Sequence, residues 1–228
     1  IYPAIMPEIP KARLDRIGTH VSLPIVTFHA YHPDLIYFFY RGRPLSGPIS
    51  HYHSAIAFAC YRAGISAQDA LAYFNGAFYE RCGYLDVWAP ERARLLAEFD
   101  ACDLDIRSCL PKWGRTGAFM YSNNHPRIRP IYDMASMLLQ AQGYTPQRSD
   151  LLPHDNLASS PAFAVYPEIG EALGVPGQYL FRAARNYQPI SLAEYVTGCY
   201  ALYATISPAE MVPFPEFRAQ LDRIATLL

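Results

Sequence analysis

The sequence contains few lysines, no paired cysteines and no long hydrophobic run. Only two of its 19 basic residues are lysine, Lys11 and Lys112, and the others are arginine. A net charge of −1 and a pI near 6.7 argue against a protein that binds nucleic acid through a broad basic surface. No stretch of about eighteen apolar residues occurs, so we expect no membrane-spanning helix.

The five cysteines are scattered and form no Cys-x-x-Cys pair. This pattern is typical of reduced thiols in a cytoplasmic protein rather than of a disulfide framework. No basic segment followed by an apolar one marks a secretory signal, and we therefore expect a cytoplasmic location. The spacings His-x-x-His and His-x-His lack a helical His-Glu-x-x-His motif, so we predict no metal site.

The amino-acid composition is typical of a globular protein. Hydrophobic residues make up 51% and charged residues 17% of the 228 positions, which is enough to bury a sizeable core. We expect a single domain over residues 1–228. Residues 1–20 hold three prolines and look like an extended lead-in, and the polar segment 144–166 marks a weak boundary.

Helical signals dominate the chain and strand signals are few. Capping residues and glycines predict helices over residues 51–63, 67–75, 90–101, 104–113, 130–142 and 167–173, one opening at Ser191 and a last one from 215. Residues 21–29, rich in β-branched side chains, predict a strand, and residues 118–122 predict a second. The expected fold class is therefore helix-rich α/β.

Two histidines and a carboxylate follow the first predicted strand, in the segment TFHAYHPD (27–34). Ligands often bind where strands of an α/β sheet end. His29, His32 and Asp34 could therefore supply a base and the carboxylate that orients it. The alternative is that His32 and Asp34 only hydrogen-bond the turn, because Asp and Pro are ordinary turn formers.

A second pair of histidines lies in HYHS (51–54), at a predicted helix start. Free backbone N–H groups at a helix start bind anions, and the helix dipole disfavours a protonated imidazole. A neutral His53 could act as a base or hold a phosphate. Alternatively, His51 or His53 only packs on the core. The preceding glycine- and proline-rich loop lacks the P-loop pattern.

The segment SNNHP (122–126) follows the second predicted strand. Asn123 and Asn124 offer amide donors of the kind that hold an oxyanion, and His125 could act as an acid or base. The alternative is an Asx-turn closed by Pro126. Because basic residues crowd this region, we expect an anionic ligand nearby; they are Lys112, Arg115, Arg127 and Arg129.

Taken in order, these motifs resemble the WcbI-type polysaccharide biosynthesis family. The resemblance rests on TFHAYHPD, GPISHYHSAIAFACYRAGISAQDALAYFN, ERCGYLDVW, FMYSNNHP and YPEIGEALGVPGQYLFR, which span about residues 20–205. It implies an SGNH-like α/β fold with a small parallel sheet and many surrounding helices. It also implies coenzyme A binding and O-acetylation of a sugar or sugar nucleotide in bacterial capsule synthesis.

The resemblance also implies the site residues. The segments that match best place His32, Asp34, His53, Asn124 and His125 in the catalytic set. The crowding of basic residues, rather than the resemblance, adds the side chains expected to hold the phosphates of coenzyme A near the HYHS helix start and the SNNHP turn: His51, Ser54, Lys112, Arg115 and Arg127, with Arg41 and Arg43 as second choices. The family's Gly-Asn-Cys-Gln turn, which supplies a candidate cysteine, is not found in this chain. Either it precedes Ile1 or this member has lost it, in which case binding without acyl transfer is the expectation.

The expected function is thus acetyl transfer from coenzyme A to a sugar hydroxyl in surface-polysaccharide synthesis. Two alternatives remain open: an SGNH-like carbohydrate esterase, and a non-catalytic subunit that binds a nucleotide or sugar phosphate. A homo-oligomer is compatible with the sequence. We further expect His32, His53 and His125 to converge on one pocket, because each lies where a strand ends or a helix begins.

Overall fold

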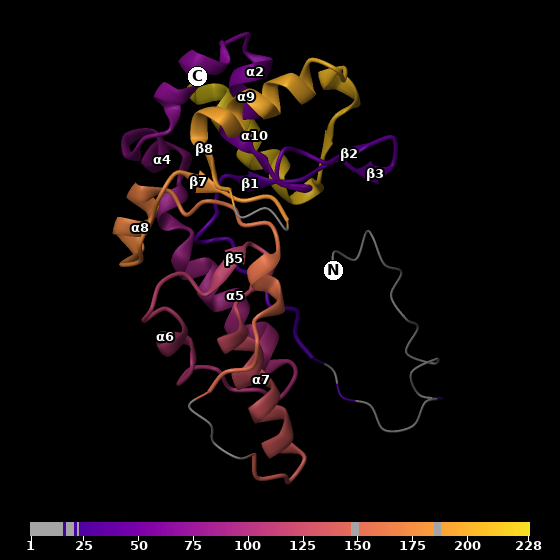
Figure 1. Ribbon diagram of the computed structural model, residues 1–228, viewed down its shortest axis with the longest axis vertical. Helices are drawn as coiled ribbons and strands as arrows, with labels where there is room; N and C mark the ends of the chain where they lie inside the picture. Colours follow the sequence, from indigo (N-terminus) through magenta and orange to yellow (C-terminus); the bar gives the residue numbers. More distant parts are fainter. Residues whose placement is uncertain (1–15, 17–20, 22, 147–150, 185–187) are drawn as a thin grey trace.

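The computed structural model describes residues 16, 21, 23–146, 151–184 and 188–228. In Figure 1 the molecule is elongated, with helices gathered in an upper and a lower part joined by a narrower waist. The upper part contains α2 (Ala55–Arg62), α3 (Ala67–Ala70), α4 (Gly76–Cys82), α9 (Leu192–Tyr203) and α10 (Arg218–Leu227). The lower part contains α5 (Trp88–Asp100), α6 (Leu110–Trp113) and α7 (Ile128–Ala141). Helix α8 (Pro167–Leu173) lies at the side of the waist.

Short 3₁₀ helices connect these elements. They are η1 (Leu71–Tyr73), η2 (Tyr84–Asp86), η3 (Asn156–Ser159), η4 (Pro208–Glu210) and η5 (Pro215–Phe217). No helix in the described part of the chain is both long and apolar enough to cross a lipid bilayer.

The strands form four small sheets, and every pairing among the described residues is antiparallel. Strand β1 (Leu35–Ile36) pairs with β4 (His53–Ser54), and β2 (Phe38–Tyr40) lies between β3 (Arg43–Pro44) and β9 (Val212–Pro213). Strand β5 (Met120–Ser122) pairs with β6 (His125–Pro126), and β7 (Leu180–Phe181) pairs with β8 (Ile190–Ser191). The fold is helix-rich α/β as expected, but the parallel sheet is not found in the described ranges.

The predicted strand at residues 21–29 does not join a sheet in its described part. Residues 23–29 have no strand pairing, and the backbone bond from Phe28 N–H to the Asn123 carbonyl (2.7 Å) fastens the segment to the turn after β5. Pro24 has no N–H to donate to a ladder. Exposure alternates along the segment, since Leu23 and Ile25 are exposed whereas Val26 and Phe28 are buried. The second predicted strand is confirmed in part as β5.

Local capping signals located most helices. Ser191 and Glu194 form the predicted capping box of α9, and Ser66 caps α3. Helix α2, however, begins at Ala55, where Ser54 accepts the Ala57 N–H at 3.0 Å. Ser50, which directly precedes the predicted helix start at residue 51, has φ +89°, which is incompatible with the extended backbone of an N-cap.

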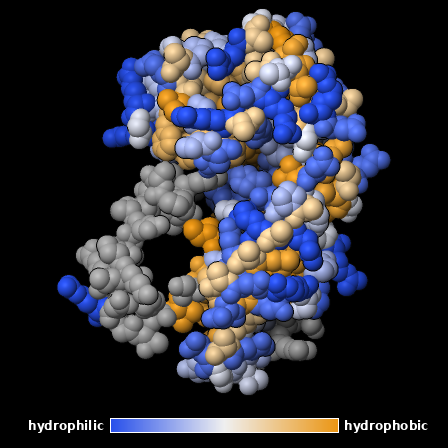
Figure 2. Space-filling model, turned by 180° about the vertical axis from the view of Figure 1, so that it is seen from behind, coloured by the Kyte–Doolittle hydropathy of each residue, from blue (hydrophilic) through white to orange (hydrophobic). Residues whose placement is uncertain are grey.

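Two hydrophobic clusters form the core. The upper one is built on α2, α4, α9 and α10, and the lower one on segment 26–31, α5, α6 and β5. Exposed apolar side chains also occur, and Figure 2 shows such residues among polar ones on the lower part.

The single-domain prediction, its boundary near 144–166 and the lead-in at residues 1–20 stay predictions. The lead-in lies outside the described residues except Arg16.

Candidate functional site

Asp34 is buried at the start of α2 rather than beside a histidine. Its carboxylate accepts the Ile56 N–H (2.9 Å) and the hydroxyls of Tyr84 (2.9 Å) and Tyr166 (2.7 Å). Burial raises the pKa of Asp34 to about 6, and a Ser54 hydrogen bond is the largest effect that opposes the rise. This carboxylate ties α2 to η2 and to the residue that precedes α8. The structure thus gives Asp34 a structural position and no imidazole to orient.

His32 and His53 are likewise buried. The His32 ring packs edge-on against Tyr31 and Phe163 and is 1% exposed. Neither ring nitrogen has a hydrogen-bond partner among the described residues, and burial lowers the pKa of His32 to about 3. The His53 ring lies 3.1 Å from the Leu45 carbonyl oxygen and 3.3 Å from the Tyr203 hydroxyl, and burial lowers its pKa to about 4. Neither ring is open to a substrate in this conformation.

The turn 122–126 holds a hydrogen-bonded cluster with Tyr52. The Tyr52 hydroxyl lies 2.7 Å from His125 Nδ1 and donates to Asn124 Oδ1 at 3.0 Å. The Ser122 hydroxyl lies 2.9 Å from the Tyr52 hydroxyl, 3.1 Å from Asn124 Oδ1 and 3.2 Å from His125 Nδ1. Tyr52 and Ser122 are buried, whereas Asn124 and His125 are partly exposed. The four side chains thus fix one histidine and one amide at the surface.

The cluster leaves two groups free to act on a ligand. Because Tyr52 and Ser122 occupy Asn124 Oδ1, its amide nitrogen is turned away as a donor without a partner in the described structure. When His125 Nδ1 carries the proton and donates it to Tyr52, Nε2 keeps a lone pair that can accept a proton. Burial lowers the pKa of His125, so the ring is neutral at physiological pH.

His29 lies next to this cluster, on the other side of Asn123. The Tyr37 hydroxyl donates to Asn123 Oδ1 at 2.6 Å, which turns the Asn123 amide nitrogen toward His29 Nε2 at 3.5 Å. The His29 backbone N–H donates to Glu91 at 2.6 Å. Burial lowers the pKa of His29, although the Glu91 carboxylate opposes the effect. A row of polar groups thus runs from His125 to His29 across the waist.

His29 also lines a cavity of about 540 Å³, a size typical of small-molecule sites. The cavity lies between η2, α5 and the start of α10. Apolar surface comes from Val87 and Phe217, and the guanidinium groups come from Arg94 and Arg223. Arg94 is paired with Glu91 and Glu98, whereas Arg223 is exposed and donates to the Cys82 carbonyl at 3.2 Å.

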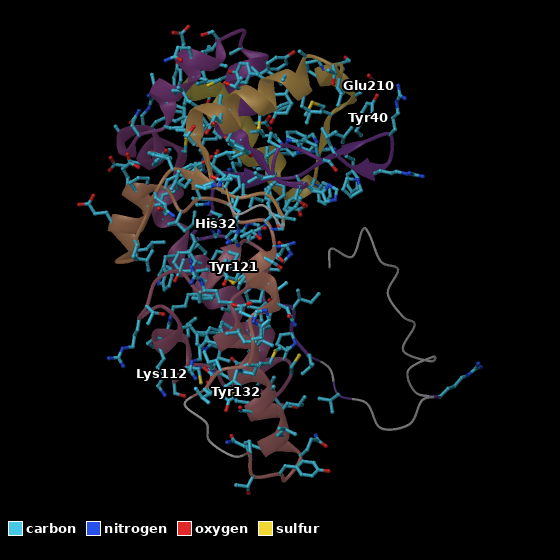
Figure 3. All side chains as sticks on the ribbon, in the orientation of Figure 1. His32, Tyr40, Lys112, Tyr121, Tyr132 and Glu210 are labelled. Carbon is cyan, nitrogen blue, oxygen red and sulfur yellow. The ribbon has the colours of Figure 1, made fainter. Side chains whose placement is uncertain are left out.

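The residues expected to bind cofactor do not form one cluster. Figure 3 shows Lys112 low in the molecule, far from Tyr40 and Glu210 at the top. Arg41, beside Tyr40, pairs with Glu210 at 3.9 Å in the β2–β3 hairpin that also holds the exposed Arg43.

The remaining expected cofactor residues are also spread over the molecule. His51 is exposed next to Ser46, and Ser54 is buried as the cap of α2. Arg115 is exposed after α6, and Arg127 is exposed before α7. Of the seven residues, only Arg127 lines a cavity described here.

The sequence did not reveal the supporting residues Tyr37, Tyr52 and Ser122. Tyr52 lies inside the HYHS motif, between two histidines, and its contact with His125 spans 73 positions. A tyrosine carries no local signal of such a partner. The described residues contain no group of three or more His, Cys, Asp or Glu side chains arranged for a metal ion.

Comparisons with known proteins identify the family. The model of the WcbI family, described as a polysaccharide biosynthesis enzyme, matches residues 10–147, which is more than half of the chain and includes all three motif segments. Nothing matches among curated proteins.

A solved structure of WcbI matches this chain with a TM-score of 0.59. That protein is described as a novel polysaccharide biosynthesis enzyme, in its native form without a disulfide bond between coenzyme A and a cysteine. The two sequences are 16% identical over 90% of this chain and 67% of the other, and the likeness shows a shared fold. The resemblance read from the motifs is confirmed: the chain belongs to the WcbI family of polysaccharide biosynthesis enzymes.

Proposed function

We propose that this protein transfers an acetyl group from coenzyme A to a hydroxyl of a sugar or sugar nucleotide during bacterial capsular or surface-polysaccharide synthesis. Family membership supports the polysaccharide context. The WcbI structure, whose description names coenzyme A, supports the donor. The observation that carries the chemistry is the cluster at residues 122–126, where a neutral imidazole and a free amide lie on adjacent residues.

In this proposal His125 is the general base. Its Nδ1 is held by Tyr52, so Nε2 can take the proton of the attacking sugar hydroxyl. The Asn124 amide, oriented by Tyr52 and Ser122, donates to the oxygen that becomes negative in the transition state. Bound acetyl-coenzyme A would supply the activated thioester, and His125 would return the proton to the coenzyme A sulfur, which leaves as the thiol when the new ester bond forms.

The cavity beside His29 suits one part of such a donor. Its volume of about 540 Å³ and the apolar side chains of Val87 and Phe217 suit a flexible arm, while Glu91, Arg94, Glu216 and Arg223 give its lining polar groups of both charges. His29 and Asn123 link this cavity to the catalytic cluster. His32, Asp34 and His53 are then residues that support the site, since all three are buried.

The cysteines that the structure buries do not supply a nucleophile in this proposal. Burial raises the pKa values of the Cys60, Cys82 and Cys199 thiols to about 12, which keeps them protonated at neutral pH. Direct attack of the sugar hydroxyl on the thioester therefore accounts for the reaction without an acyl-enzyme on these residues.

Incubation with acetyl-coenzyme A labelled in the acetyl group, with and without a panel of sugars and sugar nucleotides, tests the proposal. We expect label in the sugar, detected by mass spectrometry, and release of free coenzyme A only when the right acceptor is present. Labelled acetate without acetylated sugar would indicate an esterase instead. Tight binding of coenzyme A with no turnover on any acceptor would indicate a binding subunit.

A further inference from the structure

Two arginines flank the ring of Tyr121 at the waist. The guanidinium carbon of Arg127 lies 4.8 Å from the ring centroid, and that of Arg182 lies 5.8 Å from it. Neither arginine forms an ion pair with a carboxylate in the described structure. Figure 3 shows Tyr121 below His32, where the upper and lower parts meet. Two positive charges thus share one aromatic ring without a counter-charge in direct contact.

A cavity of about 270 Å³ opens beside this ring. Tyr121, Arg127, Phe163 and Gln178 are among its walls. Its lining does not include Ser122, Asn124 or His125, and it shares no residue with the lining of the cavity beside His29.

Asp155, the carboxylate that accepts the Tyr121 hydroxyl, is also held by backbone donors. It accepts the Ile128 N–H (3.0 Å), the Leu157 N–H (3.1 Å) and the Tyr121 hydroxyl (3.1 Å). These three donors hold Asp155 against the start of α7 and distribute its charge over neighbouring dipoles. Asp155 orients the Tyr121 ring and forms no ion pair with Arg127 or Arg182 in the described part of the chain.

Arg182 is held in place and lacks one acceptor. Its backbone forms two hydrogen bonds with Ala162 (2.9 and 3.0 Å), and Nη2 donates to the Ser160 carbonyl at 3.1 Å. Its Nε is buried and has no hydrogen-bond partner among the residues that the structure describes. A buried N–H without an acceptor is destabilising, and such groups are commonly satisfied by a bound molecule or a water.

We propose that Arg127 binds a phosphate monoester of a small-molecule ligand in the Tyr121 cavity, and that Arg182, which lies beside the Tyr121 ring but is not among the lining residues, adds a second positive charge. Guanidinium groups bind phosphate oxygens through paired, charge-assisted hydrogen bonds, and two arginines suit a dianion better than one. The phosphate can belong to a phosphorylated sugar or be the 3′-phosphate of coenzyme A. The affinity of this site for a phosphate can be measured whether or not the protein transfers an acyl group.

Calorimetric titration of the full chain tests this site with two matched ligand pairs. One pair is coenzyme A and dephospho-coenzyme A, and the other is hexose 1-phosphate and the free hexose. We expect the phosphorylated member of one pair to bind more tightly, and Arg182→Gln and Arg127→Gln each to weaken that binding by about 10- to 100-fold. The pair that responds identifies the source of the phosphate.

Arg92→Gln is the matched control, because Arg92 is exposed on α5 and away from both cavities. It should bind as the unmodified protein does. Inorganic phosphate should compete with the ligand, and higher salt should weaken its binding. Unchanged affinity in Arg127→Gln, an exposed position where folding is not at risk, would overturn the proposal even if Arg182→Gln failed to fold. Equal binding of both members in each pair would also overturn it.

Discussion

At the scale of single residues, Asp34 joins segments that are far apart in the sequence. Its partners Ile56, Tyr84 and Tyr166 come from α2, η2 and the residue before α8, so one carboxylate fixes three elements. The sequence motif TFHAYHPD suggested either catalysis or a hydrogen bond within the turn for this residue, whereas its carboxylate contacts reach distant segments. Three distant donors could not be inferred from local spacing.

Asp34→Ala should destabilise the protein by about 3–5 kcal/mol, because it leaves three buried donors without an acceptor. Asp34→Asn, which retains one acceptor oxygen, should cost less. Urea unfolding at pH 7 measures both, with the exposed Asp222→Ala as control. A loss below about 1 kcal/mol in Asp34→Ala, the usual size of one net hydrogen bond, would contradict the structural role.

His32 supplies a prediction about acid stability. The unfolded chain protonates this histidine below about pH 6.5, whereas the folded chain does so only near pH 3. Acid therefore favours unfolding as pH falls from 6.5 toward 3, and the stability gained from a neutral buried ring is complete only above 6.5.

His32→Phe should remove this acid sensitivity while keeping a ring in the same apolar surroundings. Between pH 7 and 5 the variant should lose about 2 kcal/mol less stability than the unmodified protein. Denaturant unfolding at several pH values gives the comparison. His154→Gln, at an exposed histidine, should leave the pH dependence unchanged. Parallel curves for His32→Phe and the unmodified protein would contradict the buried, unpartnered environment.

At the scale of elements, capping signals in the sequence predicted the helices well. The strands were predicted poorly. Ser66, Ser191 and Glu194 act within three residues of each other, so the sequence shows the whole interaction. Helix α4, bounded by Asn75 and Gly83, carried the same kind of signal and was overlooked. The strands have two or three residues each, and their partners are set by contacts across the chain, as in the pairing of β2 with β9.

Glycine at position 170 in α8 permits a close backbone approach. A Cβ there would lie 2.6 Å from the Val175 carbonyl oxygen and 2.8 Å from the Gly177 nitrogen. Gly170→Ala should therefore displace the loop 175–177, which lines the Tyr121 cavity, and lower the midpoint of thermal unfolding by several degrees. At Gly114 a Cβ would meet only the Tyr31 hydroxyl at 3.6 Å, so Gly114→Ala should have little effect. Equal midpoints for the two variants would refute this close packing.

At the scale of the whole molecule, the two hydrophobic clusters meet at a waist where the polar groups collect. Tyr37 and Tyr52 come from the upper part, and Asn123, Asn124 and His125 come from the turn after β5 in the lower part. The sequence supplied the turn and its histidine as candidates. The tyrosines that orient them could not be predicted, because their contacts depend on how the two parts join.

The rate of labelled acetyl transfer by His125→Gln tests the central claim most directly. With the acceptor identified for the unmodified protein, we expect kcat to fall by about 100- to 10,000-fold, because glutamine fills a similar space but cannot accept the proton. His154→Gln, at an exposed histidine away from the waist, should keep the full rate, and circular dichroism should show both variants folded. A folded His125→Gln variant that transfers acetyl at the unmodified rate would contradict the assignment of the 122–126 cluster as the catalytic site.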